Sequence, residues 1–168
     1  SDWVASTSRN WRKRTSPIFW ICAKASCPRS RASMKTNDLL KMVRDQAKKL
    51  NVQVVLRPYK TVKFQGEYSD GYFLEPDIEG PWKGTPGRLV VATKCPKTEW
   101  TWTLLHEYVH MMQWFRNDPI FLTEDYLELE KATEKETRKL AKQYNLPINL
   151  PARKRDSESY LKWLASKS

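Results

Sequence analysis

The spacing of apolar residues changes several times along the chain, and each change marks a predicted element. Residues 34–50 (MKTNDLLKMVRDQAKKL) carry a clear helical pattern. Residues 52–57 and 61–64 are rich in β-branched and aromatic side chains, which predicts two short strands. Residues 68–73 (YSDGYF) have the composition of a hairpin-like turn. The first part of the fold is therefore predicted to be one helix followed by short strands.

A stretch rich in glycine and proline separates these strands from the next one. All five glycines lie between Gly66 and Gly87, and residues 75–87 hold three prolines, so this stretch is predicted to be a surface loop. Residues 88–93 (RLVVAT) then predict another strand. This strand is expected either to lie inside the sheet or to form an edge to which an extended peptide adds through main-chain hydrogen bonds.

A long helix is predicted next, over residues 98–116. The segment contains no Gly or Pro, begins after Pro96 and ends before Asn117. Both sides of the helix are apolar, so we expect it to be buried nearly all round. One side carries Trp102, Leu105, Val109 and Met112, and the other carries Leu104, Met111 and Phe115.

A second helix is predicted over residues 123–144, with Thr123 as its N-cap, acids in the first turn and cations in the last. Its helical phase places Glu130 inward and Glu128 outward. The predicted inward face has Tyr126, Glu130, Thr133, Glu134, Thr137, Ala141 and Tyr144, and the predicted outward face has Glu124, Glu128, Lys131, Lys135, Lys139 and Lys142. A glutamate on a buried face is uncommon unless it is paired or bound to a metal.

The first 33 residues differ in composition from the rest of the chain. They hold seven Lys/Arg against one acid, and they therefore supply more than half of the net charge of +11. They show no periodic apolar pattern, so we interpret residues 1–33 as a leader outside the fold and residues 34–168 as one domain. A transit peptide and a nucleic-acid-binding arm are the functional alternatives for this leader.

The hydropathy and the cysteine content of the chain indicate the cellular compartment in which it is expected. No apolar stretch approaches the roughly 20 residues that a transmembrane helix needs. Cys95 is the only cysteine of the predicted domain, which gives no disulfide framework and fits a reducing compartment. We therefore expect a cytoplasmic protein, in the host cell if the chain is viral, with Cys95 as a spectator.

The chain has two histidines, and both belong to one motif of the first long helix. His106, Glu107 and His110 spell H-E-x-x-H. Residues four apart lie one turn apart on a helix, so both imidazoles can reach one zinc ion while Glu107 turns toward the attacking water. The plainer alternative is an amphipathic helix with two unrelated histidines. Polar groups inside a buried helix need partners, however, and a metal would supply one.

A catalytic zinc takes three protein ligands and leaves one position for water. No third histidine exists, Cys22 and Cys27 lie in the leader and Cys95 stands alone, so we expect a carboxylate as the third ligand. Glu130 on the predicted inward face is the candidate, and an ordinary salt-bridge partner is the alternative. Glu134, one turn later, is either the acceptor for the free N–H of a zinc histidine or a solvated charge.

These motifs resemble a known family. The H-E-x-x-H motif followed by Glu130 on the next helix is similar to the thermolysin-type zincins. The wider stretch 88–148, with its HEYVHMMQW run and a helix ending in N-L-P-I, resembles more closely the small metallopeptidase-like proteins of tailed bacteriophages. The resemblance implies a minimal α+β zincin-like domain with an N-terminal helix, a sheet of three or four strands, the motif helix and a third-ligand helix. It implies His106, His110 and Glu130 as zinc ligands and Glu107 as the general base.

Together these patterns predict a zinc-dependent hydrolase, most simply a metallopeptidase that cleaves a peptide or protein. Two rival hypotheses belong to other functional classes. One is a structural or binding protein of a phage particle, in which zinc stabilises the fold. The other is a basic protein associated with nucleic acid. The run Arg153, Lys154 and Arg155 is most simply solvated, with phosphate contact as the alternative. Candidate donors to an oxyanion are Tyr68, Tyr72, Tyr108 and Tyr126.

Overall fold

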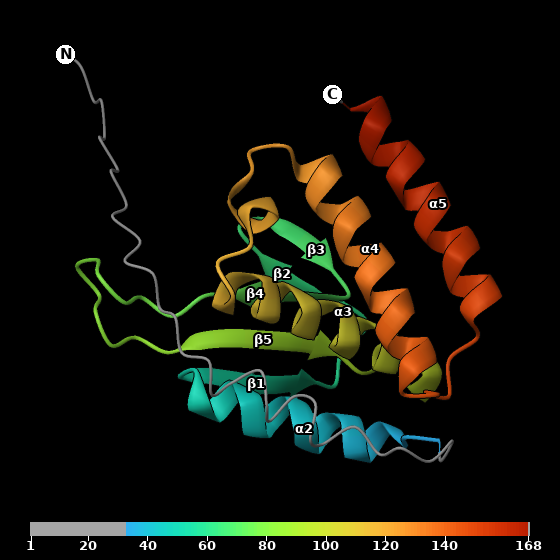
Figure 1. The fold of residues 1–168 in the computed structure, drawn as a ribbon, viewed down its shortest axis with the longest axis horizontal. Coiled ribbons are helices and arrows are strands. Elements are labelled where there is room, and N and C mark those ends of the chain that lie inside the picture. The colour runs from blue at the N-terminus through green and yellow to red at the C-terminus, as the bar shows by residue number, and fades with distance from the viewer. Residues whose placement is uncertain (1–32, 168) are drawn as a thin grey trace. The chain divides into compact units, whose positions relative to one another are not determined.

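Helices and short strands follow one another in an α+β order over residues 33–167, which the computed structural model describes (Figure 1). Most of the predicted leader lies outside these residues. Ser33, the last residue of the predicted leader, donates a hydrogen bond of 2.7 Å to the carbonyl of Asn145 and so contacts the fold. The elements are α2 (Thr36–Lys49), β1 (Val52–Arg57), β2 (Val62–Phe64), β3 (Glu67–Ser69), β4 (Gly71–Leu74), β5 (Gly87–Ala92), α3 (Lys97–Phe115), the 3-10 helix η1 (Pro119–Leu122), α4 (Tyr126–Gln143) and α5 (Leu150–Ser166).

Strand β5 is the central strand of a three-stranded sheet. It pairs parallel with β1 and antiparallel with β4, and β2 and β3 form a separate two-stranded sheet. The strand before the motif helix is therefore interior, and the prediction that it could be an edge is wrong. The edge strand that follows the hairpin is β4.

The two faces of β5 pack against different parts of the fold. Leu89 and Val91 pack in the main core with α2 and α3, whereas Val90 and Ala92 pack with Val62 of the hairpin. Burial on both faces is typical of a central strand, and it explains why the sequence of β5 is a nearly continuous apolar run. The main core is made by Leu39, Val43, Ala47, Val52, Leu89, Val91, Leu104, Leu105, Tyr108, Met111, Ala141 and Leu146.

The hairpin turn lies before the place predicted for it. Strands β2 and β3 pair with Phe64 opposite Glu67, so Gln65 and Gly66 form the two-residue turn. Both residues have positive φ, 50° and 84°, as a type I′ turn requires. Residues 68–73 do not form a hairpin turn; they belong to β3, Asp70 and β4, where the chain passes from one sheet to the other.

Asparagine ends three of the four α-helices of the described residues. Asn51, Asn117 and Asn145 follow the C-cap residues of α2, α3 and α4 with φ of 56°, 52° and 48°. Asparagine tolerates this left-handed conformation, so the predicted ends of α3 and α4 are confirmed to within one residue. The start of α4 is different, because Asp125 and not Thr123 caps it, with its side chain accepting from the Glu128 amide.

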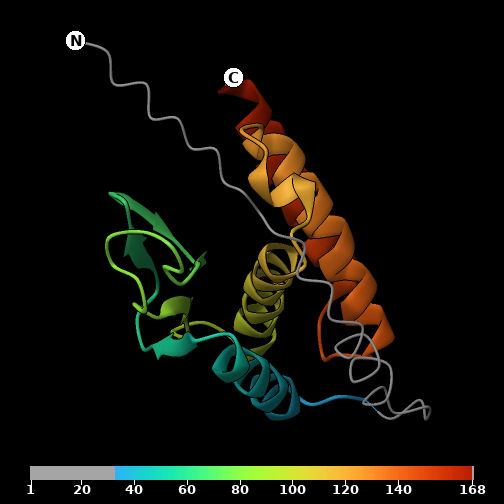
Figure 2. The same ribbon diagram turned by 60° about the vertical axis from the view of Figure 1, so that its left-hand side comes forward.

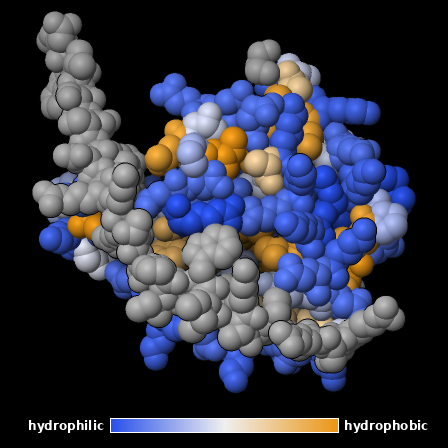
Figure 3. Space-filling view, in the orientation of Figure 1, coloured by the Kyte–Doolittle hydropathy of each residue, from blue (hydrophilic) through white to orange (hydrophobic). Residues whose placement is uncertain are grey.

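The C-terminal helix α5 was not predicted. It packs against α4, away from the sheet (Figures 1 and 2). Its inward positions include Leu150, Ser157, Leu161 and Leu164, so a polar residue interrupts the apolar stripe that would have revealed the helix. The surface is largely hydrophilic in the view of Figure 3, and among the described residues no helix combines the length and hydrophobicity needed to cross a bilayer.

Candidate metal centre

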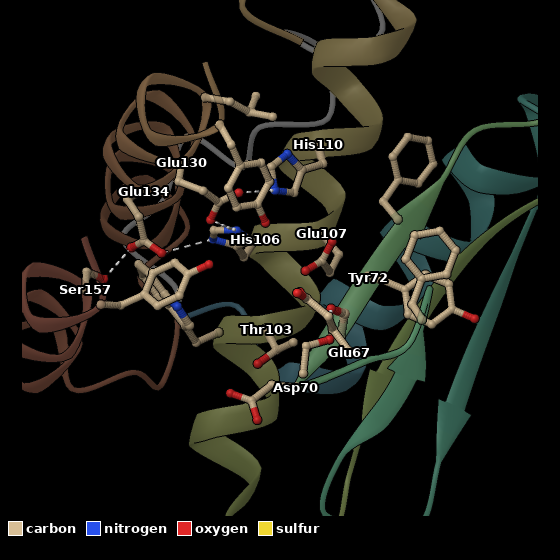
Figure 4. Close-up of a pocket in the computed structure, with 18 of the residues that line it drawn as sticks. Glu67, Asp70, Tyr72, Thr103, His106, Glu107, His110, Glu130, Glu134 and Ser157 are labelled. Atoms are coloured by element: carbon tan, nitrogen blue, oxygen red, sulfur yellow. Dashed lines mark hydrogen bonds and ion pairs between the residues drawn. The ribbon is translucent and has the colours of Figure 1, made fainter. Parts of the chain in front are cut away.

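Two packed helices supply the candidate site. His106, Glu107 and His110 lie on α3, and Glu130 and Glu134 lie on α4, which faces it (Figure 4). Helix α3 has no exposed residue from Thr101 to Phe115, so the prediction that it is buried nearly all round is confirmed. Burial of these polar groups means that each needs a partner from the neighbouring helices.

The burial of the inward face of α4 and the exposure of its outward face agree with the predicted helical phase, with one exception. Glu130, Thr133, Glu134, Thr137 and Ala141 are buried, and all six predicted outward residues are exposed. Tyr126 is the exception on the inward face, because 54% of its surface is exposed at the first turn.

The two histidines and Glu130 converge on one point. His106 Nε2 lies 3.4 Å from Glu130 Oε2, and His110 Nε2 lies 3.1 Å from Glu130 Oε1. One ligand atom from each residue lies within 4.8 Å of the other two. The structure therefore brings the three predicted ligands into a group that can hold a metal ion.

The surroundings of the Glu130 carboxylate are also those expected of a metal ligand. Its Oε1 is buried and, among the described residues, has no hydrogen bond of good geometry although His110 is only 3.1 Å away. A buried carboxylate oxygen without a directed donor is costly unless a cation completes it. Two imidazole nitrogens and one carboxylate oxygen form a donor set that suits zinc.

The other nitrogen of His106 faces Glu134. Nδ1 lies 3.2 Å from Glu134 Oε1, an ion-pair contact whose angle is not that of a hydrogen bond. Glu134 Oε2 accepts a hydrogen bond from the hydroxyl of Ser157 on α5 (Figure 4). The predicted alternative for Glu134, a solvated charge, is wrong, because the residue is only 5% exposed. Sequence reasoning missed Ser157, since nothing local in α5 points to α4.

The other nitrogen of His110 has its own partner, which was also missed. Nδ1 lies 3.2 Å from Gln113 Oε1, and Gln113 Nε2 donates to Thr133 Oγ1 at 3.1 Å. Gln113 is 1% exposed. The signal for it was present in the sequence, because Gln113 follows His110 by three residues and so lies on the same side of α3.

Burial and charge shift the pKa values of these groups in different directions. Burial would raise the pKa of Glu130, but the two histidines outweigh it and hold that pKa well below its usual range. Burial would lower the pKa of His106, but Glu130 and Glu134 raise it well above its usual value. The pKa of Glu107 is raised, mainly by burial, with the histidines opposing the shift. Of these carboxyls, Glu107 is the one whose surroundings favour gaining a proton.

A pocket of about 680 Å³ opens over this group. Its volume is within the range of small-molecule binding sites. The general-base candidate Glu107 lines it, and β4 packs closely there: a Cβ at Gly71 would lie 2.8 Å from Thr103 and 3.3 Å from Glu107. Only glycine permits this approach of the strand to the helix.

Aromatic side chains form much of the wall of the pocket. Tyr68, Tyr72 and Tyr126 line it, whereas Tyr108 lies in the main core and does not. Tyr160 of α5, which was not among the candidate tyrosines, also lines it and lies close to Tyr126. The pocket thus combines a polar floor on α3 and α4 with aromatic walls from the strands and α5.

Comparisons with protein-family models, curated proteins and solved structures found no match for this chain.

Proposed function

We propose that this chain is a zinc-dependent hydrolase, most simply a metallopeptidase. The observation that carries the proposal is the convergence of His106, His110 and Glu130 beside a buried Glu107 in one pocket. Three protein ligands beside an open pocket are typical of catalytic zinc sites, whereas structural zinc sites are closed by four protein ligands.

In the proposed hydrolysis, a bound metal ion and Glu107 would have different roles. A bound zinc ion would act as a Lewis acid that activates water and polarises the scissile carbonyl. His106, His110 and Glu130 would hold it, with Glu134 and Gln113 orienting the imidazoles from behind. Glu107 would accept the proton of the attacking water and deliver it to the leaving amine.

A peptide substrate is supported by the position of β4. Among the described strands it is one of the two edges of its sheet, and Gly71, Tyr72 and Phe73 line the pocket. An extended peptide that adds to such an edge is held by main-chain hydrogen bonds, which do not depend on its sequence. Tyr126 on α4 and Tyr160 on α5 also line the pocket, and their phenol hydroxyls can donate to a developing oxyanion.

The test combines metal analysis with hydrolysis of an unstructured protein such as casein. The purified chain is expected to bind one zinc ion and to cleave the protein. Glu107→Gln should keep the zinc and lose hydrolysis by about 10²-fold or more, because the general base is removed while the ligands remain. Glu99→Gln, an exposed residue of the same helix, is the matched control and should change neither quantity.

The rival hypotheses make different predictions. A wild-type chain that holds zinc but cleaves no peptide or protein would favour the zinc-stapled structural protein. Steep weakening of DNA or RNA binding with salt would favour the nucleic-acid-associated protein. Equal hydrolysis by wild type and Glu107→Gln would contradict the assignment of the general base.

A further inference from the structure

Helix α5 is held to the fold in an unusual way. It spans Leu150–Ser166, and its one buried residue is Ser157, which is 6% exposed. Leu150 at its first turn packs against the main core, while Leu161 and Leu164 are only half-buried. A helix normally docks through a broad apolar stripe, so α5 has little apolar burial to hold it.

The one buried side chain of α5 bonds to the candidate metal centre. The Ser157 hydroxyl donates to Glu134 Oε2, and the other oxygen of the same carboxylate lies 3.2 Å from His106 Nδ1 (Figure 4). The Arg138 guanidinium also lies near Glu134, but its Nη1 is 4.0 Å from Oε2 and its side chain is partly exposed. Ser157 is therefore the close donor that fixes the orientation of the Glu134 carboxylate.

The second histidine has no such link to α5. His110 is supported by Gln113 on its own helix and by Thr133 on α4. Both supports persist if α5 moves away, because α3 and α4 pack directly on each other. Of the two imidazoles, His106 is therefore the one whose support includes a side chain of α5.

We propose that docking of α5 and loading of the metal site are coupled through Ser157, Glu134 and His106. The inference rests on the proposed metal site and adds a regulation of it. A ligated His106 needs its Nε2 directed at the ion and its Nδ1 proton directed at Glu134. Glu134 is held for that contact by Ser157, so a docked α5 favours metal binding. Linkage is reciprocal, so bound metal must favour a docked α5 to the same degree.

The first test measures zinc affinity by competition with a chromophoric chelator, using the full chain. Ser157→Ala should weaken zinc binding by roughly 10-fold, at the lower end of the effect of outer-shell partners. Ser159→Ala is the matched control, because this exposed serine of the same helix bonds only to the Arg155 carbonyl and should leave affinity unchanged.

A double-mutant cycle separates this role from a general loss of packing. Glu134→Gln should weaken zinc binding by roughly 10- to 100-fold. If Ser157 acts through Glu134, adding Ser157→Ala to Glu134→Gln should change affinity by no more than about twofold. Full additivity of the two effects would overturn the proposed chain of contacts.

Hydrogen exchange tests the reciprocal effect on the wild-type chain, so it does not depend on any variant folding. Zinc should slow amide exchange in α5 in wild type and in Ser159→Ala, and much less in Ser157→Ala. Equal zinc affinity of Ser157→Ala and Ser159→Ala, or α5 exchange unaffected by zinc in wild type, would overturn the coupling while leaving the metal site in place. A wild-type chain that binds no zinc would overturn the metal site and the coupling together.

Discussion

The two faces of α4 carry the same acidic residue type in opposite surroundings. On the outward face Glu128 is exposed and pairs with Lys131 at 2.8 Å. On the inward face Glu130 is 4% exposed and meets two imidazoles. An exposed pair of this kind contributes little to stability, whereas a buried carboxylate must be compensated by charges or directed donors.

Position on the helix, and not residue type, therefore gives these acids their chemistry. Glu134 shows the same rule one turn later, since it is buried and contacts both His106 and Ser157. The inward face is costly for the fold unless each polar group is satisfied. A bound cation would satisfy Glu130 and the two imidazoles at once, so metal binding and the stability of this face are expected to rise and fall together.

The largest expected effect comes from removing a partner of the inward face. His106→Ala or His110→Ala leaves two ligands, which cannot hold the ion tightly. Zinc content measured after dialysis should fall from one ion per chain to nearly none. Full zinc occupancy in either variant would contradict the site.

An intermediate effect is expected when the two faces are compared directly. Glu130→Gln replaces an anionic ligand by a neutral one, so zinc affinity should fall by more than the roughly 10- to 100-fold typical of outer-shell partners. Glu128→Gln is the matched control on the outward face, and it should leave zinc affinity unchanged. Chelator competition measures both variants. The opposite result, with zinc lost from Glu128→Gln and kept by Glu130→Gln, would reverse the contrast between the faces.

Sequence alone predicted the local parts of this fold. Helices α2, α3 and α4 follow from apolar spacing and from the residues at their ends, because these signals act within a few residues. The hairpin was misplaced, since residues 68–73 have turn-forming residues between aromatics while the turn itself needs only the conformations of Gln65 and Gly66. Helix α5 was missed because Ser157 interrupts its apolar stripe.

In the candidate site, too, some features could be predicted from the sequence and others could not. His106, Glu107, His110 and the inward phase of Glu130 could be predicted because helical phase is a local property. Their convergence needs α3 to pack on α4, which the resemblance implied and the spacing did not show. Ser157 could not be predicted, because its partner Glu134 lies 23 residues away on another helix. Contacts of that kind depend on tertiary packing alone.

The smallest expected effect concerns Gln113, which joins the inward face of α4 to His110. Gln113→Ala leaves Thr133 without its amide partner and leaves His110 Nδ1 without the contact that sets its orientation. Zinc affinity should fall by roughly 10-fold, because the ligand itself remains. The free energy of unfolding should fall by about 1–3 kcal/mol in the metal-free chain, since a buried polar group loses its partner. Gln53→Ala, an exposed glutamine of β1, is the control, and denaturant unfolding with and without zinc measures both. Unchanged zinc affinity in Gln113→Ala would show that His110 is oriented without this contact, and would leave the α5-linked support of His106 as the one that matters.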